Sequence, residues 1–271
     1  MATLNVDDAR LGVRRVAHER GSGYQRAYAR LDAIDCGLCD AGRHAGSVRL
    51  PRFRRYAFVA RWYDQLSGER TVYQRPRLTG VAALDLRPGE RVLDIGCGTG
   101  LNMPWLVDLV GTSGEVVGVD TSATMLDRSR SRISDAGWAN VTVLRGDAAS
   151  LDTLLAEHDR YDAVLFTYAL SIIDSWQQAF DQAVRRLRPG GRVVVVDLGL
   201  PTGRWRWLTP LARLACFSGG ADPYRQPWTL VTHSLQSATH TVLRGGHVHS
   251  AAGQVAGRRS DGTGREAEPS R

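Results

Sequence analysis

The sequence predicts an α/β fold, a doubly wound, Rossmann-like and mostly parallel sheet of seven strands that ends in an antiparallel hairpin. Three observations predict it. Short apolar runs typical of buried strands alternate with longer amphipathic stretches between about residues 91 and 199. A glycine-rich turn directly follows the first of those runs. Near the end of the chain, Gly245-Gly246 separates two short strand-like segments, which is a hairpin pattern.

Five apolar segments are expected to form the parallel strands. They are residues 91–95, 115–120, 141–147, 161–168 and 192–199. The helices expected between them cover about 102–110, 122–136 and 175–187, and the last is expected to stop at the breaker 188–191. Residues 238–245 and 247–253 are expected to form the hairpin. Because apolar strands that alternate with helices are covered on both faces, the sheet should lie between two helical layers.

The chain is expected to hold one domain, over residues 51–256, which has helices near 53–66 and 70–84 before its first strand. Residues 1–50 show no sustained period and are predicted to be a disordered leader, and 257–271 a disordered tail. Whether the leader belongs to the mature protein stays open. The aromatic segment at about 199–228 is expected either to cover a pocket for a lipophilic or flat molecule or to form an amphipathic helix that covers the sheet.

Charge and hydropathy exclude several classes of protein. The net charge is +7, but residues 1–61 carry 12 Arg against 6 acidic residues, while residues 62–253 carry 19 of each. The body is therefore neutral, and no nucleic-acid partner is predicted, because a phosphate-binding face should itself be basic. The sequence contains neither an apolar run long enough to span a membrane nor a secretory signal. A cytoplasmic protein with thiol cysteines and no metal site is expected.

The segment from Val92 to Gly100 carries the strongest chemical signal. A buried strand that contains Asp94 is followed by glycines at positions 96, 98 and 100, which open a helix. This spacing lets the backbone approach a ligand closely, with helix N–H groups facing it. It differs from the GxGxxG of dinucleotide-binding turns, and Asp94 would repel a phosphate but suit a ligand ammonium group.

Polar residues also end the next three strands. Asp120 ends the second strand, where its carboxylate can accept both hydroxyl groups of a ribose. Asp147 and Ala148 follow the third strand and can meet an adenine edge with a side-chain acceptor and a backbone N–H. Thr167 and Tyr168 end the fourth strand and would close the wall of the same cleft. A ligand with an amino-acid head, a ribose and an adenine fits this order, and that ligand is S-adenosylmethionine.

These motifs resemble those of class I S-adenosylmethionine-dependent methyltransferases. The resemblance rests on VLDIGCGTG, the GVD strand end, GDA and LRPGG, and runs from about residue 58 to 253. Residues 59–64 resemble the first helix of UbiE-type quinone-biosynthesis C-methyltransferases, while Tyr63-Asp64, Gly68 and Arg77 are spaced as in bacterial phospholipid N-methyltransferases. The likeness implies cofactor contacts at the following positions: Thr99, Asp120, Asp147, Ala148 and Thr167.

The expected cofactor-binding set is wider than these five. It comprises Tyr63, Asp94, Gly96, Cys97, Gly98, Thr99, Gly100, Asp120, Thr121, Met125, Asp147, Ala148 and Thr167. Tyr63 and His247 are the candidate catalytic residues, the latter as a proton acceptor between His240 and His249. Asp197 is expected either to face the cleft or to cap the loop after the fifth strand.

The function predicted is methyl transfer from S-adenosylmethionine to a small, lipophilic or aromatic acceptor such as a quinone. Two alternatives stay open: a phospholipid N-methyltransferase of the phosphatidylethanolamine type, and a catalytically silent S-adenosylmethionine-binding protein. A transient contact with a membrane surface also stays open, through Arg204 and Arg206. Nothing in the sequence indicates an obligate protein partner.

Overall fold

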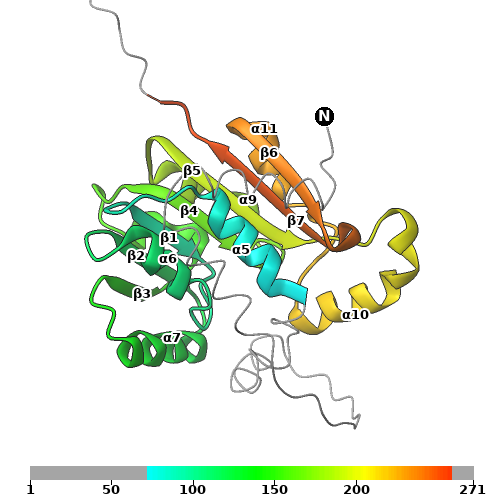
Figure 1. The fold of residues 1–271 in the computed structure, drawn as a ribbon, viewed down its shortest axis with the longest axis horizontal. Helices are drawn as coiled ribbons and strands as arrows, with labels where there is room; N and C mark the ends of the chain where they lie inside the picture. Colours follow the sequence, from blue (N-terminus) through cyan, green and yellow to red (C-terminus); the bar gives the residue numbers. More distant parts are fainter. Residues whose placement is uncertain (1–71, 258–271) are drawn as a thin grey trace, which may run out of the picture.

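The computed structural model describes residues 72–257, which form a seven-stranded sheet in the order β3-β2-β1-β4-β5-β7-β6 (Figure 1). The strands are β1 (Arg91–Ile95), β2 (Glu115–Asp120), β3 (Val141–Arg145), β4 (Tyr161–Thr167), β5 (Leu187–Leu198), β6 (Gln236–Leu243) and β7 (Val248–Gln254). Strands β1 to β5 pair in parallel, whereas β7 pairs antiparallel with both β5 and β6. The predicted fold class is confirmed. The predictions for residues 1–50 and for Tyr63 concern residues outside the described part of the chain.

Helices cover both faces of this sheet. They are α5 (Gln74–Ala83), α6 (Met103–Val110), α7 (Ala123–Ala136), α8 (Leu151–Leu154), α9 (Trp176–Arg185), α10 (Thr209–Gly219) and α11 (Trp228–Ser234). Short 3-10 turns are η2 (Ala148–Ser150), η3 (Gly203–Leu208) and η4 (Arg244–Gly246). The helices α5, α6 and α7 share one apolar cluster with the sheet, and α8, α9 and α11 share the other. In the described part, no helix combines the length and the apolar character that crossing a bilayer requires.

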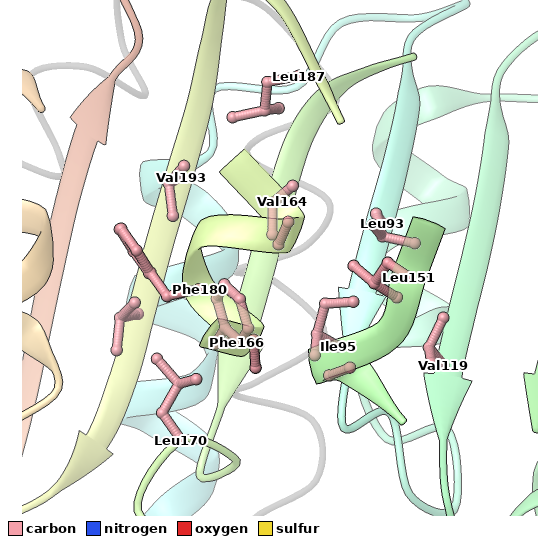
Figure 2. Packing of buried hydrophobic residues seen from close by; sticks show 14 of the residues in the cluster. Leu93, Ile95, Val119, Leu151, Val164, Phe166, Leu170, Phe180, Leu187 and Val193 are labelled. Atoms are coloured by element: carbon pink, nitrogen blue, oxygen red, sulfur yellow. The ribbon is translucent and has the colours of Figure 1, made fainter. Parts of the chain in front are cut away.

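The core forms because every central strand is apolar on both faces. Leu93 and Ile95 of β1 point to the α8–α9 side, while Val92 points to the α5–α6 side. Figure 2 shows the α9 side of this core, where Phe166 of β4 lies against Phe180 of α9. Their ring centroids are 6.1 Å apart with an interplanar angle of 26°. Burial on both faces explains why the strands are continuous apolar runs rather than alternating ones.

The helix α5 packs unusually close to the sheet because of one glycine. A Cβ atom at Gly80 would clash with Cγ2 of Val196 in β5, so only glycine permits this approach. The close packing brings the buried Arg77, one turn earlier in α5, towards the carboxyl ends of the central strands. In this way a packing constraint on one side of the sheet positions a charged group that belongs to the candidate site.

Two local expectations differ from the structure. The helix α9 ends at Arg185, and β5 begins at Leu187, so the expected breaker 188–191 lies inside a strand. Tyr161 pairs with Leu187 and Ala163 pairs with Arg192, which leaves the intervening residues of β5 in a bulge. Gly190 adopts a φ of 77° there. The Pro-Gly-Gly sequence therefore shapes a bulge rather than a loop, because β-sheets tolerate such residues at bulges.

The second correction concerns the aromatic segment. An amphipathic helix that covers the sheet would bury its large side chains, but α10 buries only the small residues Ala212 and Cys216. Leu211, Leu214 and Phe217 are exposed. Figure 1 shows α10 (yellow) beyond the carboxyl end of β5 rather than over the middle of either face. The large side chains of α10 therefore do not pack on the sheet, whereas Cys216, Ala221 and Trp228 of the same segment belong to the core clusters.

Candidate functional site

The candidate site lies where the strand order reverses. From β1 the chain proceeds to β2 and β3 on one side of the sheet, whereas β4 and β5 lie on the other side. The loops that follow β1 and β4 therefore leave in opposite directions, and ligands of open α/β sheets bind in the crevice between such loops. Ile95 pairs with Phe166 at this point, so the carboxyl ends of β1 and β4 are level with each other.

The glycine-rich turn after β1 has one open position. Gly96, Gly98 and Gly100 all adopt positive φ values, of 69°, 53° and 79°. A Cβ at Gly96 would lie 2.5 Å from the Cβ of Ala169, and one at Gly100 would lie 2.7 Å from the sulfur of Met103. At Gly98 it would meet no atom of the described part of the chain within 4 Å. Gly96 and Gly100 therefore serve the packing of the turn, while Gly98 faces open space into which a ligand can fit.

A buried polar network lies beneath this turn. Asn102 donates from Nδ2 to Asp94 Oδ1 over 2.8 Å and to Thr167 Oγ1 over 2.6 Å. Arg77 donates from a guanidinium nitrogen to Asn102 Oδ1 over 2.9 Å. The side-chain amide of Asn102 thus connects β1, β4 and α5: both of its N–H groups donate, and its oxygen accepts from Arg77. Sequence reasoning did not assign Asn102 or Arg77 to the site, although Arg77 was part of the spacing that resembles phospholipid N-methyltransferases.

Asp94 is the group in this network that stays incompletely paired. Its side chain is fully buried, and within the described residues 72–257 its Oδ2 has no hydrogen-bond partner. Burial raises the pKa of Asp94 to about 7, against the opposing effects of the Asn102 hydrogen bond and the Arg77 charge. A buried carboxylate oxygen without a donor is costly in a folded protein, and a cationic ligand group would supply the missing donor.

Asp120 connects the first two strand ends. Its Oδ2 accepts the Gly98 backbone N–H over 2.9 Å, and its Oδ1 accepts that of Ser122 over 2.8 Å. Burial raises the pKa of this carboxyl, while the backbone donors oppose the shift. The side chain remains partly accessible. A carboxylate held in this way keeps acceptor capacity for further donors, such as sugar hydroxyls.

The residues expected around an adenine and its ribose lie further along the same edge. Asp147 caps the turn η2, where its Oδ1 accepts the Ala149 N–H over 2.9 Å, and it is exposed. Ala148 is buried beside it. Thr121 is exposed after β2, and Met125 is buried in the first turn of α7. These four residues follow β2 and β3, next to the strand ends that carry Asp94 and Asp120.

Three residues of the expected set contribute no free side chain to this edge. The sulfur of Cys97 packs over β2, where a Cβ at Gly118 would lie 2.8 Å from it, and burial raises the pKa of the thiol well above its usual range. Gly100 packs against Met103. Thr99 is buried, and its carbonyl accepts Arg132 Nε over 3.0 Å. For these positions the structure supports a role of the backbone rather than of the side chain.

His247 lies at the same end of the sheet, directly before Val248, which pairs with Leu198 at the end of β5. Its Nδ1 lies 3.0 Å from the carbonyl oxygen of Gly199, and its Nε2 lies 3.2 Å from the hydroxyl of Tyr73. Since a carbonyl oxygen only accepts, Nδ1 carries the proton and Nε2 accepts from Tyr73. Burial lowers the pKa of His247, which favours the neutral ring at pH 7. Its neighbours His240 and His249 bond to each other over 2.9 Å.

Two tyrosines join His247 to the buried network. The Tyr168 hydroxyl donates to the Tyr73 carbonyl over 2.8 Å, and the two rings meet edge to face with centroids 5.2 Å apart. The Arg77 guanidinium lies 5.2 Å from the centroid of the Tyr168 ring. Neither Tyr73 nor the contact of Tyr168 with Arg77 was expected from sequence. A continuous polar and aromatic wall therefore runs from Asp94 to His247.

Asp197 does not belong to this wall. Its carboxylate accepts the Ser171 N–H over 2.9 Å, the Ser171 hydroxyl over 2.5 Å and the Leu198 N–H over 2.8 Å. Burial raises its pKa to about 6. Of the two expected roles, capping of a loop is therefore the one observed, and it joins the end of β5 to the loop after β4.

Part of the chain is similar in sequence to known methyltransferases. Residues 92–191 match the family described as Methyltransferase domain. The demethylmenaquinone methyltransferase of Symbiobacterium thermophilum is 28% identical over 167 residues, which are 58% of this chain and 65% of that protein. The ubiquinone/menaquinone biosynthesis C-methyltransferase UbiE of Ectopseudomonas mendocina is 36% identical over 117 residues, 43% of this chain and 44% of that protein. The chain thus spans about half to two thirds of the length of these relatives.

Solved structures share the fold. A SAM-dependent methyltransferase from Aquifex aeolicus superposes with a TM-score of 0.53 at 16% identity, over 74% of this chain and 98% of that one. Phosphoethanolamine N-methyltransferase 2 of Haemonchus contortus, in complex with S-adenosyl-L-methionine, gives 0.58 at 16% identity, over 76% and 60%. Residues 92–191 thus match a methyltransferase domain, and this part of the chain is similar in sequence to UbiE and in fold to S-adenosylmethionine-dependent methyltransferases.

The cofactor of this class is S-adenosylmethionine, and the residues present fit it. The fit rests on the buried, unpaired Oδ2 of Asp94 and on the open space in front of Gly98. A cationic amino group satisfies the first, and the second leaves room for a ligand to contact the backbone. The Asp120 carboxylate, on the neighbouring strand, has the acceptor chemistry that sugar hydroxyls need.

The raised pKa of Asp94 predicts a specific pH dependence of stability. Since the folded-state pKa of about 7 exceeds that of an unfolded aspartate, near 3.9, the folded state binds this proton more tightly. The free energy of unfolding should therefore fall as pH rises from about 5 to about 7 and level off above. In Asp94→Asn this part of the slope should disappear, as measured by urea unfolding across that range.

The exposed Asp127→Asn on α7 is the matched control and should keep the wild-type slope. Asp197, whose pKa is also raised, contributes equally to all three proteins and cancels in the comparison. A wild-type slope that persists in Asp94→Asn would contradict the description of Asp94 as a buried carboxyl with a raised pKa.

Proposed function

We propose that the protein is an S-adenosylmethionine-dependent methyltransferase whose acceptor is a small, lipophilic or aromatic molecule. One observation carries the proposal. The buried carboxylate of Asp94 leaves Oδ2 unpaired beneath the open turn at Gly98, one strand away from the Asp120 carboxylate. Such a pair of acidic groups suits a ligand that carries both an ammonium group and a ribose, and it does not suit a dinucleotide phosphate.

In this proposal each strand end takes one part of the cofactor. Asp94 receives the amino group, and Thr99 and Thr167 lie by the methionine end. Asp120 accepts from the ribose hydroxyls. Around these residues we assign Gly96, Cys97, Gly98, Gly100, Thr121, Met125, Asp147 and Ala148 to backbone contacts and to the adenine side of the cleft. Tyr63, outside the described residues, keeps its proposed cofactor contact from the family resemblance.

The cofactor supplies an activated methyl group on a sulfonium sulfur. The protein therefore has to align the acceptor with that methyl group, exclude water and receive a proton. Orientation of this kind contributes roughly 7–11 kcal/mol in the best model reactions. The wall formed by Tyr73, Tyr168 and Arg77 offers an aromatic surface on which a flat acceptor can lie.

His247 is the candidate proton acceptor on this wall. Its Nε2 accepts the hydroxyl of Tyr73, and its Nδ1 is held by the Gly199 carbonyl. An acceptor hydroxyl placed against Tyr73 would give its proton to the tyrosine oxygen while the tyrosine proton moves to Nε2. The His247 ring thereby becomes an imidazolium, and the acceptor becomes an oxyanion, which is more nucleophilic than the hydroxyl. The lowered pKa of His247 keeps the ring neutral and able to accept.

The names of two relatives support one acceptor class. These relatives are named for demethylmenaquinone and for ubiquinone/menaquinone biosynthesis, which supports a quinol acceptor for this chain. The phospholipid N-methyltransferase is the second candidate, and exposed apolar and arginine side chains on η3 and α10 favour it. A silent S-adenosylmethionine-binding protein is the third, and only a turnover measurement separates it from the others.

Asp120→Ala tests the proposed cofactor site. Loss of its hydrogen bonds to ribose should raise the dissociation constant for S-adenosylmethionine by about 5- to 150-fold, from roughly 1–3 kcal/mol. Isothermal titration calorimetry measures the change. The control Asp127→Ala removes an exposed carboxylate from α7 and should bind like the wild type. Equal affinity of the two variants would remove Asp120 from the site.

Methyl-labelled S-adenosylmethionine tests the reaction. With the purified protein, label should enter a reduced naphthoquinol that lacks its ring methyl group, and His247→Ala should lower this rate while leaving the cofactor dissociation constant unchanged. Label in phosphatidylethanolamine instead would favour the second candidate. Tight cofactor binding without label in either acceptor would contradict an enzymatic function and favour the silent binding protein.

A further inference from the structure

Residues 203–219, which form η3 and α10, present an apolar stripe to the outside. Trp207 is 72% exposed, Leu211 63%, Leu214 63% and Phe217 70%. Leu211, Leu214 and Phe217 follow one another at spacings of three residues, which places them on one side of α10, and Trp207 precedes them in η3. Large apolar side chains are scattered singly on ordinary protein surfaces, whereas a contiguous group marks a surface that binds something.

The opposite side of α10 contacts the domain through small residues. Ala212 and Cys216 are its buried residues, and Cys216 belongs to the apolar cluster that includes Val248. The helix therefore binds the protein with its small side chains and leaves the large ones exposed. An amphipathic helix whose role was to complete the core would have the reverse arrangement.

The charges around the stripe have one sign. Arg204, Arg206 and Arg213 are exposed, and no acidic residue occurs between Asp197 and Asp222. The Arg204 guanidinium lies 5.1 Å from the centroid of the Trp205 ring, so cationic and aromatic groups are interleaved. We call the stripe and these three arginines the basic apolar face. An occupant that complements it needs both hydrocarbon and negative charge.

The basic apolar face is fixed beside the candidate site. Thr202 donates its N–H to the Gly245 carbonyl over 2.8 Å, immediately before η3. Trp205 packs on the same turn, where a Cβ at Gly245 would lie 2.5 Å from its Cδ1. His247 follows that turn and bonds to Gly199. A surface that covers this face would therefore lie close to the acceptor side of the cleft.

We propose that the basic apolar face docks the protein on the surface of a lipid bilayer that contains anionic headgroups. The leucines and Phe217 would enter the boundary between headgroups and acyl chains, and Trp207 would lie at the interface. The arginines would pair with lipid phosphates. In this contact the protein lies on the membrane surface, and the basic apolar face does not span the bilayer.

Charge complementarity distinguishes this occupant from the others. A second copy would place the same three arginines opposite one another if the face paired with itself. Residues 1–61 carry 12 Arg and 6 acidic residues, so that segment has the same sign as the face. An anionic bilayer offers the opposite sign together with an apolar layer. This consequence rests on the proposed function: docking would place the site where a lipophilic acceptor is dissolved.

Flotation of the full chain with vesicles tests the proposal. The protein should bind vesicles of phosphatidylglycerol with phosphatidylcholine and should not bind phosphatidylcholine alone. Since a basic residue near an anionic surface contributes about 1 kcal/mol, or roughly fivefold, Arg204→Gln/Arg206→Gln should lower the partition coefficient by about 10- to 30-fold. Leu211→Gln/Leu214→Gln should lower it at least as much. The control Arg128→Gln/Arg185→Gln, on α7 and α9, should bind like the wild type.

The free energy of unfolding in urea, measured on each variant without vesicles, shows that the variants fold and does not depend on the proposed function. Wild-type protein that does not float with anionic vesicles would overturn the proposal. Equal loss of binding in the control pair would overturn it too, since general charge would then explain the contact. A dimer in sedimentation equilibrium that dissociates in Leu211→Gln/Leu214→Gln would assign the face to a second copy instead.

Discussion

The arrangement of the site depends on one buried carboxylate. Asp94 lies at the reversal of strand order with one oxygen bonded to Asn102 and the other unpaired. Such a group is costly to bury, and the surroundings reduce the cost only in part, through the amide of Asn102 and the charge of Arg77. The remaining cost is removed when a cation binds, so the same feature that weakens the free protein would favour the cofactor.

Several distant segments are connected to that carboxylate through a chain of contacts. Arg77 reaches Asn102 only because Gly80 lets α5 approach β5 closely. Asn102 in turn bonds to Thr167, which joins the ends of β1 and β4. From Arg77 the contacts continue over Tyr168 to Tyr73 and His247. Cofactor side and acceptor side are thus parts of one connected structure, and a change at α5 should affect both.

The fold could be predicted from the sequence because its strands are continuous apolar runs with breakers between them. The strand ends followed from the same pattern, which placed Asp94, Asp120 and Asp147 at one edge. The bulge at 188–191 could not be predicted, because Pro-Gly-Gly indicates a break in regular structure but does not indicate whether strand pairing resumes after it. Asn102, Arg77 and Tyr73 were missed for another reason. Their roles arise from contacts between segments 25 to 174 residues apart, which local patterns do not encode.

The outward side of α10 illustrates the same limit. Its sequence is amphipathic, and amphipathic helices usually cover a core, but the small residues Ala212 and Cys216 face the domain. Which side of a helix faces inward depends on what it packs against, and here the small Cys216 is the residue of α10 that joins the cluster with Val248. Of the aromatic residues in the segment predicted to cover an acceptor pocket, Trp207, Phe217 and Tyr224 lie on the surface, whereas Trp228 is buried.

Determining the structure with S-adenosylhomocysteine bound tests the central claim most directly, because that molecule keeps the amino-acid head, the ribose and the adenine of the cofactor. The account predicts its amino group within hydrogen-bonding distance of Asp94 Oδ2, its ribose hydroxyls on Asp120, and its sulfur on the side of the cleft that leads to Tyr73 and His247. Binding at another place on the domain, with Asp94 still unpaired, would contradict it.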